Sequence, residues 1–196
     1  MEFDTTNQRP VSKSKSRARS ALGGSLALLM GGCTCCPPEM FTGCIDFESL
    51  SFGTRYVFQD TFTDSGAMIT VEAFQWDNGT WTNGNYAQVD NRMKAGVSGL
   101  DVQTNNVNLR FDFGALGVNG LSMAFGEYGG NLNLQVNGEF RNFENFAPLN
   151  GDTVGGAAVV VQGGTGNDTG SVNLAGKVQS FAVGGQELWV DDICAL

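Results

Sequence analysis

Asn106-Val107-Asn108-Leu109-Arg110-Phe111-Asp112-Phe113 is the stretch that decides the fold class. Its four apolar residues alternate with polar ones, which is the pattern of an antiparallel strand with one buried face. Similar alternation recurs in residues 67–74, 131–136 and 171–183, while no window after residue 44 has a sustained helical period. Asn-Gly and Gly-Gly pairs, which tolerate the positive φ of tight turns, punctuate these stretches. We therefore predict an all-β chain, an antiparallel β-sandwich and most simply a jelly roll.

Composition excludes several classes of function. The 196 residues include 28 glycines and no histidine, with a formal net charge of −9. Without histidine there is no Ser-His-Asp or Cys-His nucleophile and no His-ligated metal site. The acidic balance argues against binding nucleic acid, which needs a basic surface to displace counterions.

The first residues have the pattern of an export signal. Five of the eleven basic residues lie in residues 1–20, and an uncharged run (ALGGSLALLM) fills residues 21–30. Such a run is too short to span a bilayer but suits a secretory signal. The following Gly-Gly-Cys resembles a bacterial lipoprotein cleavage box, with Cys33 as the lipid-bearing residue. We expect a signal over residues 1–33, a Cys/Pro linker over 34–43 and a sandwich domain over 44–196; the alternative is a flexible tail beside a short buried helix.

Cysteine usage also suits an exported protein. If Cys33 carries lipid, four cysteines remain, an even number suited to two disulfides in an oxidising compartment. Cys44 and Cys194 open and close the predicted domain, so a bridge between them would join its first and last strands. The remaining cluster, Cys33-Thr34-Cys35-Cys36, leaves a soft-metal or iron–sulfur site open as an alternative.

Both ends of the domain resemble a known family. Residues 44–56 (CIDFESLSFGTRY) and 181–193 (FAVGGQELWVDDI) are similar to the opening and closing strands of secreted galactose-binding-like jelly rolls, the fold of many carbohydrate-binding modules. The resemblance implies that these strands pair and that an opening Glu and a closing Asp share a structural calcium. The implied ligands are Glu48 and Asp191, with Asp192 and Asp46 as further candidates. Alternatively, Asp191 and Asp192 only protect an exposed edge strand with charge.

Aromatic residues in a polar loop suggest a binding surface. Trp76, Trp81 and Tyr86 lie in or beside residues 76–86 (WDNGTWTNGNY), where Asp77 and Asn78 could hydrogen-bond the hydroxyls of a stacked sugar. The alternative is a cross-strand aromatic pair that stabilises a hairpin.

Catalysis would have to rely on paired carboxylates, as in glycosidases. Glu127 has the most site-like neighbourhood among the available candidates, which are Glu72, Glu127, Glu139, Glu144 and Glu187. No glycosidase signature accompanies them, so we expect a non-catalytic protein. Our leading hypothesis is an exported, cell-surface or extracellular sandwich that binds carbohydrate or another surface polymer, with no nucleic-acid partner and membrane contact only through a lipid anchor. A self-assembling subunit of an extracellular coat, matrix or filament is the second hypothesis, and a carbohydrate-active hydrolase is the third.

Overall fold

A computed structural model describes residues 40–96 and 99–196 of the chain. The chain divides into two units, Met1–Cys35 and Cys36–Leu196, and every described residue belongs to the second. The expected signal, its Cys33 and linker residues 34–39 therefore lie outside the described residues. Of the helices in the described part, none is long and apolar enough to cross a membrane.

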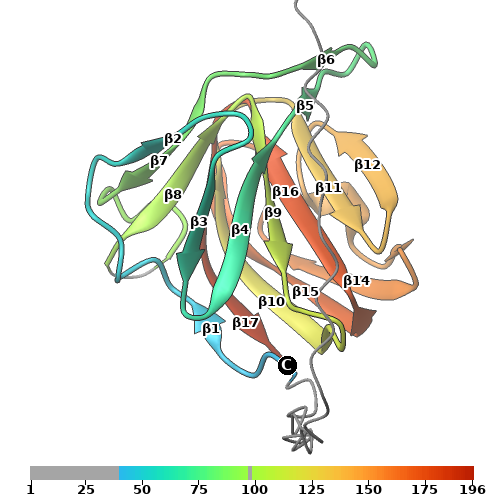
Figure 1. The fold of residues 1–196 in the computed structure, drawn as a ribbon. Helices are drawn as coiled ribbons and strands as arrows, with labels where there is room; N and C mark the ends of the chain where they lie inside the picture. Colours follow the sequence, from blue (N-terminus) through green and yellow to red (C-terminus); the bar gives the residue numbers. More distant parts are fainter. Residues whose placement is uncertain (1–39, 97–98) are drawn as a thin grey trace, which may run out of the picture. The chain divides into compact units, whose positions relative to one another are not determined.

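Two antiparallel sheets face each other in the described domain (Figure 1). The strand order in sheet A is β13 (Thr153–Val154), β14 (Ala157–Gln162), β15 (Asp168–Val178), β10 (Val118–Glu127), β17 (Leu188–Ala195), β8 (Asp101–Asn105), β7 (Tyr86–Asp90) and β2 (Arg55–Tyr56), and β1 (Cys44–Ile45) also pairs with β17. The order in sheet B is β12 (Glu139–Phe143), β11 (Leu132–Val136), β16 (Ser180–Gly185), β9 (Val107–Asp112), β4 (Ala67–Glu72) and β3 (Thr61–Asp64). Strands β5 (Phe74–Gln75) and β6 (Trp81–Thr82) form a separate hairpin, and a short 3-10 helix, η1 (Ala147–Leu149), follows β12. The predicted all-β antiparallel sandwich is confirmed, while jelly-roll connectivity stays a prediction.

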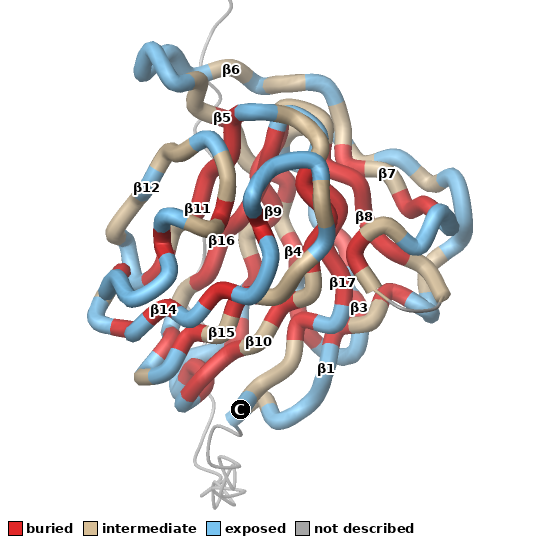
Figure 2. The backbone as a smooth tube through the Cα atoms, turned by 180° about the vertical axis from the view of Figure 1, so that it is seen from behind, coloured by how far each residue is buried: buried red, intermediate tan, exposed pale blue. Residues whose placement is uncertain are grey.

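The core lies between the two sheets, as the alternation predicts. Val107, Leu109, Phe111 and Phe113 are all buried in one continuous hydrophobic cluster. Phe111 contacts Phe181 of the neighbouring strand β16, with ring centroids 5.6 Å apart. Buried residues accordingly concentrate on the strands, and exposed residues concentrate on the loops (Figure 2). Burial of this apolar face stabilises the sandwich because it removes hydrocarbon surface from water.

The first and last strands of the domain pair with each other in sheet A. Cys44 pairs with Cys194 in the register of β1 and β17, and their sulfurs form a disulfide. The predicted pairing of these two cysteines is therefore confirmed. Between Ser122 and Ala124 of β10 the register with β17 shifts, and Asp192 opposite this point has φ of 48°. This β-bulge interrupts the alternation of β17, in which Asp191 is buried and Asp192 is exposed.

One predicted strand is in fact two. The alternation of residues 171–183 is divided at Gln179 between β15 of sheet A and β16 of sheet B. Asn137 supports this crossing because its Oδ1 accepts hydrogen bonds from the N–H groups of Gln179 (2.7 Å) and Ser180 (3.3 Å). A pattern with period two does not distinguish one long strand from two strands that continue the same alternation in different sheets.

The two ends of the sandwich carry different loops. As drawn in Figure 1, the upper end holds the connections after β10 and after β16, together with the β5–β6 hairpin. The lower end holds the β3–β4 and β9–β10 turns and the C-terminus. We use these two names below.

Candidate functional site

A row of asparagines holds the β5–β6 hairpin across the upper part of the outer face of sheet B. Asn108, Asn133 and Asn142 occupy neighbouring positions on β9, β11 and β12, with Gly184 of β16 between the first two. Their side-chain amides face away from the core, since the residues on either side of Asn108 and Asn133 are core residues.

These amides bond to the backbone of the segment leading into the hairpin. Asn108 Nδ2 donates to the carbonyl oxygen of Ala73 (2.6 Å), and Asn142 Nδ2 donates to that of Gln75 (2.9 Å). Asn133 accepts from the Gln75 N–H (2.8 Å) and donates to the Gln75 carbonyl (2.9 Å), as a neighbouring strand would. The row therefore supplies hydrogen-bond partners to the edge of β5 that does not pair with β6.

Trp81, one of the predicted ligand-binding residues, is placed on sheet B by this hairpin. Its side chain is 53% exposed and lies beside Phe140 of β12, with ring centroids 5.3 Å apart. Phe140 was not predicted as a site residue, because nothing in the sequence of its strand indicates which aromatic side chains lie beside it. The two rings border a hollow of about 30 Å³, whose other lining residues are Glu72, Asn108, Asn133, Gln135 and Ala182.

A charged row lies beside the aromatic pair. Arg110 of β9 forms an ion pair with Glu72 of β4 and donates from its terminal nitrogen to Gln135 Oε1 (2.8 Å). The guanidinium has five N–H groups, so two contacts leave donors for a ligand. We call Glu72, Trp81, Arg110, Gln135 and Phe140 the binding face: two apolar rings next to fixed donors and acceptors.

The other predicted ligand-binding residues have separate partners. Trp76 packs edge-to-face on Phe74 (5.3 Å between centroids), and Arg55 covers the ring of Tyr86 at 4.2 Å. The Asp77 N–H donates to Asn131 Oδ1 (2.6 Å), and Asn78 Oδ1 accepts from the Thr80 N–H (2.9 Å) within the hairpin turn. The hairpin expected under the alternative interpretation is present, but the ring contacts of Trp76 and Trp81 are with Phe74 and Phe140 respectively.

Carboxylates gather on the outer face of sheet A, beneath residues 91–96, which follow β7. Asp90, Asp101 and Asp191 are each no more than 3% exposed, and Glu48 of the neighbouring turn accepts a hydrogen bond from the Leu100 N–H (2.7 Å). We call these four residues the acidic cluster. Asp90 and Asp101, which end β7 and begin β8, were not predicted as site residues, because strand pairing brings them to Asp191 from distant positions.

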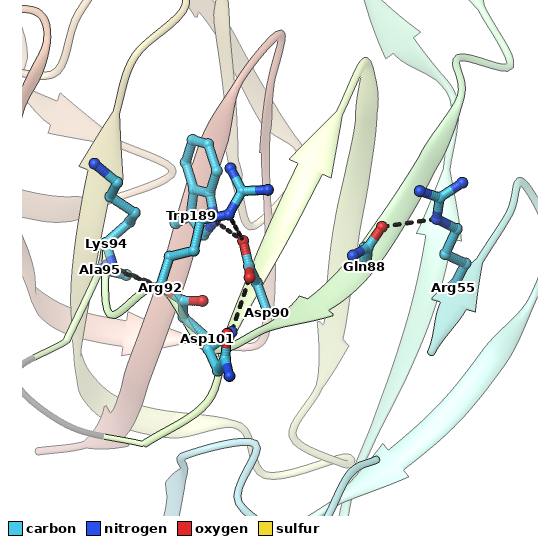
Figure 3. Close-up of polar contacts among 9 residues, drawn as sticks. Arg55, Gln88, Asp90, Arg92, Lys94, Ala95, Asp101 and Trp189 are labelled. Carbon is cyan, nitrogen blue, oxygen red and sulfur yellow. Dashed lines mark hydrogen bonds and ion pairs between the residues drawn. The ribbon is translucent and has the colours of Figure 1, made fainter. Parts of the chain in front are cut away.

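Two carboxylates of the acidic cluster have backbone or side-chain partners. Asp90 Oδ2 accepts from the Trp189 indole (3.0 Å) and pairs with Arg92 (3.1 Å), as Figure 3 shows. Asp101 Oδ2 accepts from the N–H groups of Lys94 (2.7 Å) and Ala95 (3.2 Å). The other oxygen of Asp101 is buried without a hydrogen-bond partner among the described residues.

Burial opposes ionisation of this cluster. The pKa of Asp191 is raised to about 8, chiefly because burial removes water from the carboxylate. The charges of Asp192, Asp101 and Glu48 also raise this pKa, and the hydrogen bond from the Asp192 N–H lowers it. The pKa of Asp101 is also raised, first by burial and then by the charge of Asp90, against the hydrogen bonds from Lys94 and Ala95. Close carboxylates without enough counter-charge favour a bound proton or a bound cation.

The four residues implied as calcium ligands lie in different environments. Glu48 and Asp191 belong to the acidic cluster, whereas Asp192 is exposed on the bulge. Asp46 accepts a hydrogen bond from the Glu48 N–H (3.3 Å), in a turn that follows the end of β1 at Ile45. Within the described residues, no three acidic or cysteine side chains are already arranged to hold a metal ion.

Glu127, the most site-like carboxylate in the sequence, supports two loops. It is buried at the upper end of β10, and its oxygens accept from the N–H groups of Phe146 (3.0 Å) and Gly166 (2.6 Å). Burial raises its pKa, the two hydrogen bonds lower it, and the charge of Asp168 raises it. Glu127 and Glu144 line a hollow of about 210 Å³, but these contacts commit both Glu127 oxygens to backbone groups.

Comparisons with protein families, curated proteins and solved structures find no match to this chain. The geometry of the binding face and of the acidic cluster therefore carries the functional argument.

Replacing Asn133 by Ala should destabilise the domain. The change removes two buried hydrogen bonds to Gln75, and we expect the free energy of unfolding in urea to fall by about 1–3 kcal/mol. Asn85→Ala is the matched control, because Asn85 is exposed and its side chain donates only to the side chain of Asn105. Equal, small effects of the two changes would show that the asparagine row does not hold the hairpin.

In chelator, the thermal stability of the protein should fall as the pH rises from about 4 to about 8. The raised pKa of Asp191 means that the folded state keeps a proton that the unfolded state has lost over this range. Asp191→Asn cannot ionise, so its melting temperature should depend less steeply on pH. The exposed Asp152→Asn serves as control, and parallel curves for all three proteins would contradict the assignment.

Proposed function

We propose that this protein is an exported, non-catalytic β-sandwich that binds a neutral polysaccharide along the binding face of sheet B. The observation that carries the proposal is the half-exposed Trp81 beside Phe140, next to a fixed row of polar side chains. The apolar C–H faces of a sugar ring stack on such aromatic side chains. Arg110 and Gln135 lie within the same face and offer hydrogen-bond partners to the hydroxyls, as polar groups do in ligand sites.

Neutral sugars suit this face better than acidic ones. Glu72 already compensates the charge of Arg110, so the guanidinium offers hydrogen-bond donors with little excess positive charge. A uronic acid would bring a carboxylate close to Glu72, and like charges repel.

We propose further that the acidic cluster holds a structural calcium. Three buried carboxylates face one arginine, Arg92, whose side chain is largely exposed, and Asp101 leaves one buried oxygen without a partner. Calcium takes several carboxylate and carbonyl oxygens, so Glu48, Asp101 and Asp191 fit as its ligands. A bound cation would offset both the repulsion between these carboxylates and the cost of burying their charge.

Export and lipid attachment at Cys33 complete the proposal. The Cys44–Cys194 disulfide supports an oxidising compartment, where such bridges persist. The resemblance of the two terminal stretches to galactose-binding-like modules supports both the calcium and the sugar ligand. In this proposal calcium stabilises the sandwich, and Trp81 and Phe140 bind the sugar.

Removal of either ring of the aromatic pair should weaken polysaccharide binding. The probes are cellulose, xylan, chitin and a mixed-linkage β-glucan, tested by pull-down and by affinity electrophoresis, with titration calorimetry on the best soluble ligand. Trp81→Ala and Phe140→Ala should each weaken binding about tenfold or more, because a bound ligand would cover both rings. Phe52→Ala is the control, since Phe52 is exposed and lies outside the binding face. Unchanged binding in both variants would rule out this face.

Calcium should raise the melting temperature of the protein. Binding only to the folded state at one hundred times Kd adds about 2.7 kcal/mol to the free energy of unfolding. Asp101→Asn and Asp191→Asn should lose most of this response, whereas the exposed Asp152→Asn should keep it. The same melting temperature in calcium and in chelator would remove calcium from the proposal and leave the sugar-binding face untouched.

A further inference from the structure

The lower end of the sandwich carries exposed apolar side chains around two hollows. One hollow of about 620 Å³ and another of about 180 Å³ share Met40, Phe41 and Thr42 as lining residues. Met68 lines the first hollow, Leu196 lines the second, and both are exposed by 47% or more. Leu116, also exposed, lies in the β9–β10 turn at the same end (Figure 1). We call Met40, Met68, Leu116 and Leu196 the lower patch.

The chain enters the described domain at this patch. Six residues lie between Cys33 and Met40, and a fully extended chain spans at most about 25 Å over those seven steps. A lipid on Cys33 would therefore keep the lower patch close to the bilayer. At that distance even a weak contact is favoured, because the tether holds the patch at a high effective concentration next to the membrane.

The charges that line the two hollows indicate which lipid surface the lower patch suits. Asp112 lines the larger hollow, and neither hollow has a lysine or arginine among its lining residues. A surface that recognised anionic headgroups would need basic residues. The patch instead offers thioether and hydrocarbon side chains, which suit the boundary between headgroups and acyl chains of a zwitterionic bilayer.

We propose that the lower patch rests on the surface of a zwitterionic phospholipid bilayer and that the binding face of sheet B extends away from it. This inference depends on the lipid anchor at Cys33 proposed above, and it does not depend on the identity of the polysaccharide. Docking at the lower end leaves the hairpin with Trp81, at the upper end, open to a ligand outside the membrane.

Methionine oxidation tests the proposal with an internal standard. Hydrogen peroxide converts exposed methionines to sulfoxides, which peptide mass spectrometry quantifies residue by residue. Met40 and Met68 belong to the lower patch, whereas Met93 is 54% exposed and precedes Lys94, whose carbonyl lies against Gly126 near the upper end of β10. On phosphatidylcholine vesicles, the processed full-length protein should oxidise Met40 and Met68 at least threefold more slowly, relative to Met93, than the Cys33→Ser variant in solution.

Two further measurements make the result decisive. Flotation with the vesicles reports the anchor: a protein that does not float overturns both the anchor and the docking. A protein that floats but has the solution ratio of Met40 and Met68 oxidation to Met93 oxidation overturns the docking alone. Leu116→Asp and Leu196→Asp should abolish the protection of Met68 without affecting flotation, whereas Val160→Asp, an equally exposed position on β14, should preserve it. Protection that survives in both patch variants would also overturn the proposal.

Discussion

The double hydrogen bond between Asn133 and Gln75 is the contact on which the binding face depends. After β4 ends at Glu72, the chain leaves sheet B and crosses its outer surface, where β5 pairs with β6 along one edge and with no described strand along the other. Asn133 supplies both a donor and an acceptor, and Asn108 and Asn142 add donors on either side. Because buried backbone groups need partners, this row fixes the path of the hairpin and with it the position of Trp81 beside Phe140.

Asparagine suits this task better than a charged side chain. Its amide presents a donor and an acceptor with the same spacing as a peptide group and loses little on burial once both are bonded. Asn137 is used in the same way: its Oδ1 accepts a hydrogen bond from the Gln179 N–H, and its Nδ2 donates to the carbonyl oxygens of Gly155 and Lys177. Asn108, Asn133 and Asn142, at outward-facing strand positions, and Asn137, in a turn, therefore all act as partners of backbone groups.

The acidic cluster arises from a different constraint. Strand pairing brings Asp90, Asp101 and Asp191 together on sheet A, and the segment after β7 covers them. Gly126 permits this cover, because a Cβ at that position would overlap the Lys94 carbonyl oxygen. The covering segment excludes water from the carboxylates, so the same packing that orders the loop raises the pKa of Asp191. Burial and electrostatic repulsion thus both disfavour the ionised carboxylates at this place until a proton or a cation neutralises the charge.

Two features could be predicted from the sequence alone: the strands, from their alternating pattern, and the link between the two ends of the domain, from the positions of their cysteines. The alternation of residues 106–113 was enough for a half-buried antiparallel strand, and Cys44 and Cys194 bracketed the domain that their disulfide closes. Only the tertiary structure decided that residues 171–183 cross between sheets, that Trp81 meets Phe140, and that Asp101 joins Asp191. Alternation records which face of a strand is buried, but it does not record which strand lies next to it. Contacts between residues that are distant in the sequence therefore depend on which strands pair, and only the folded structure shows that pairing.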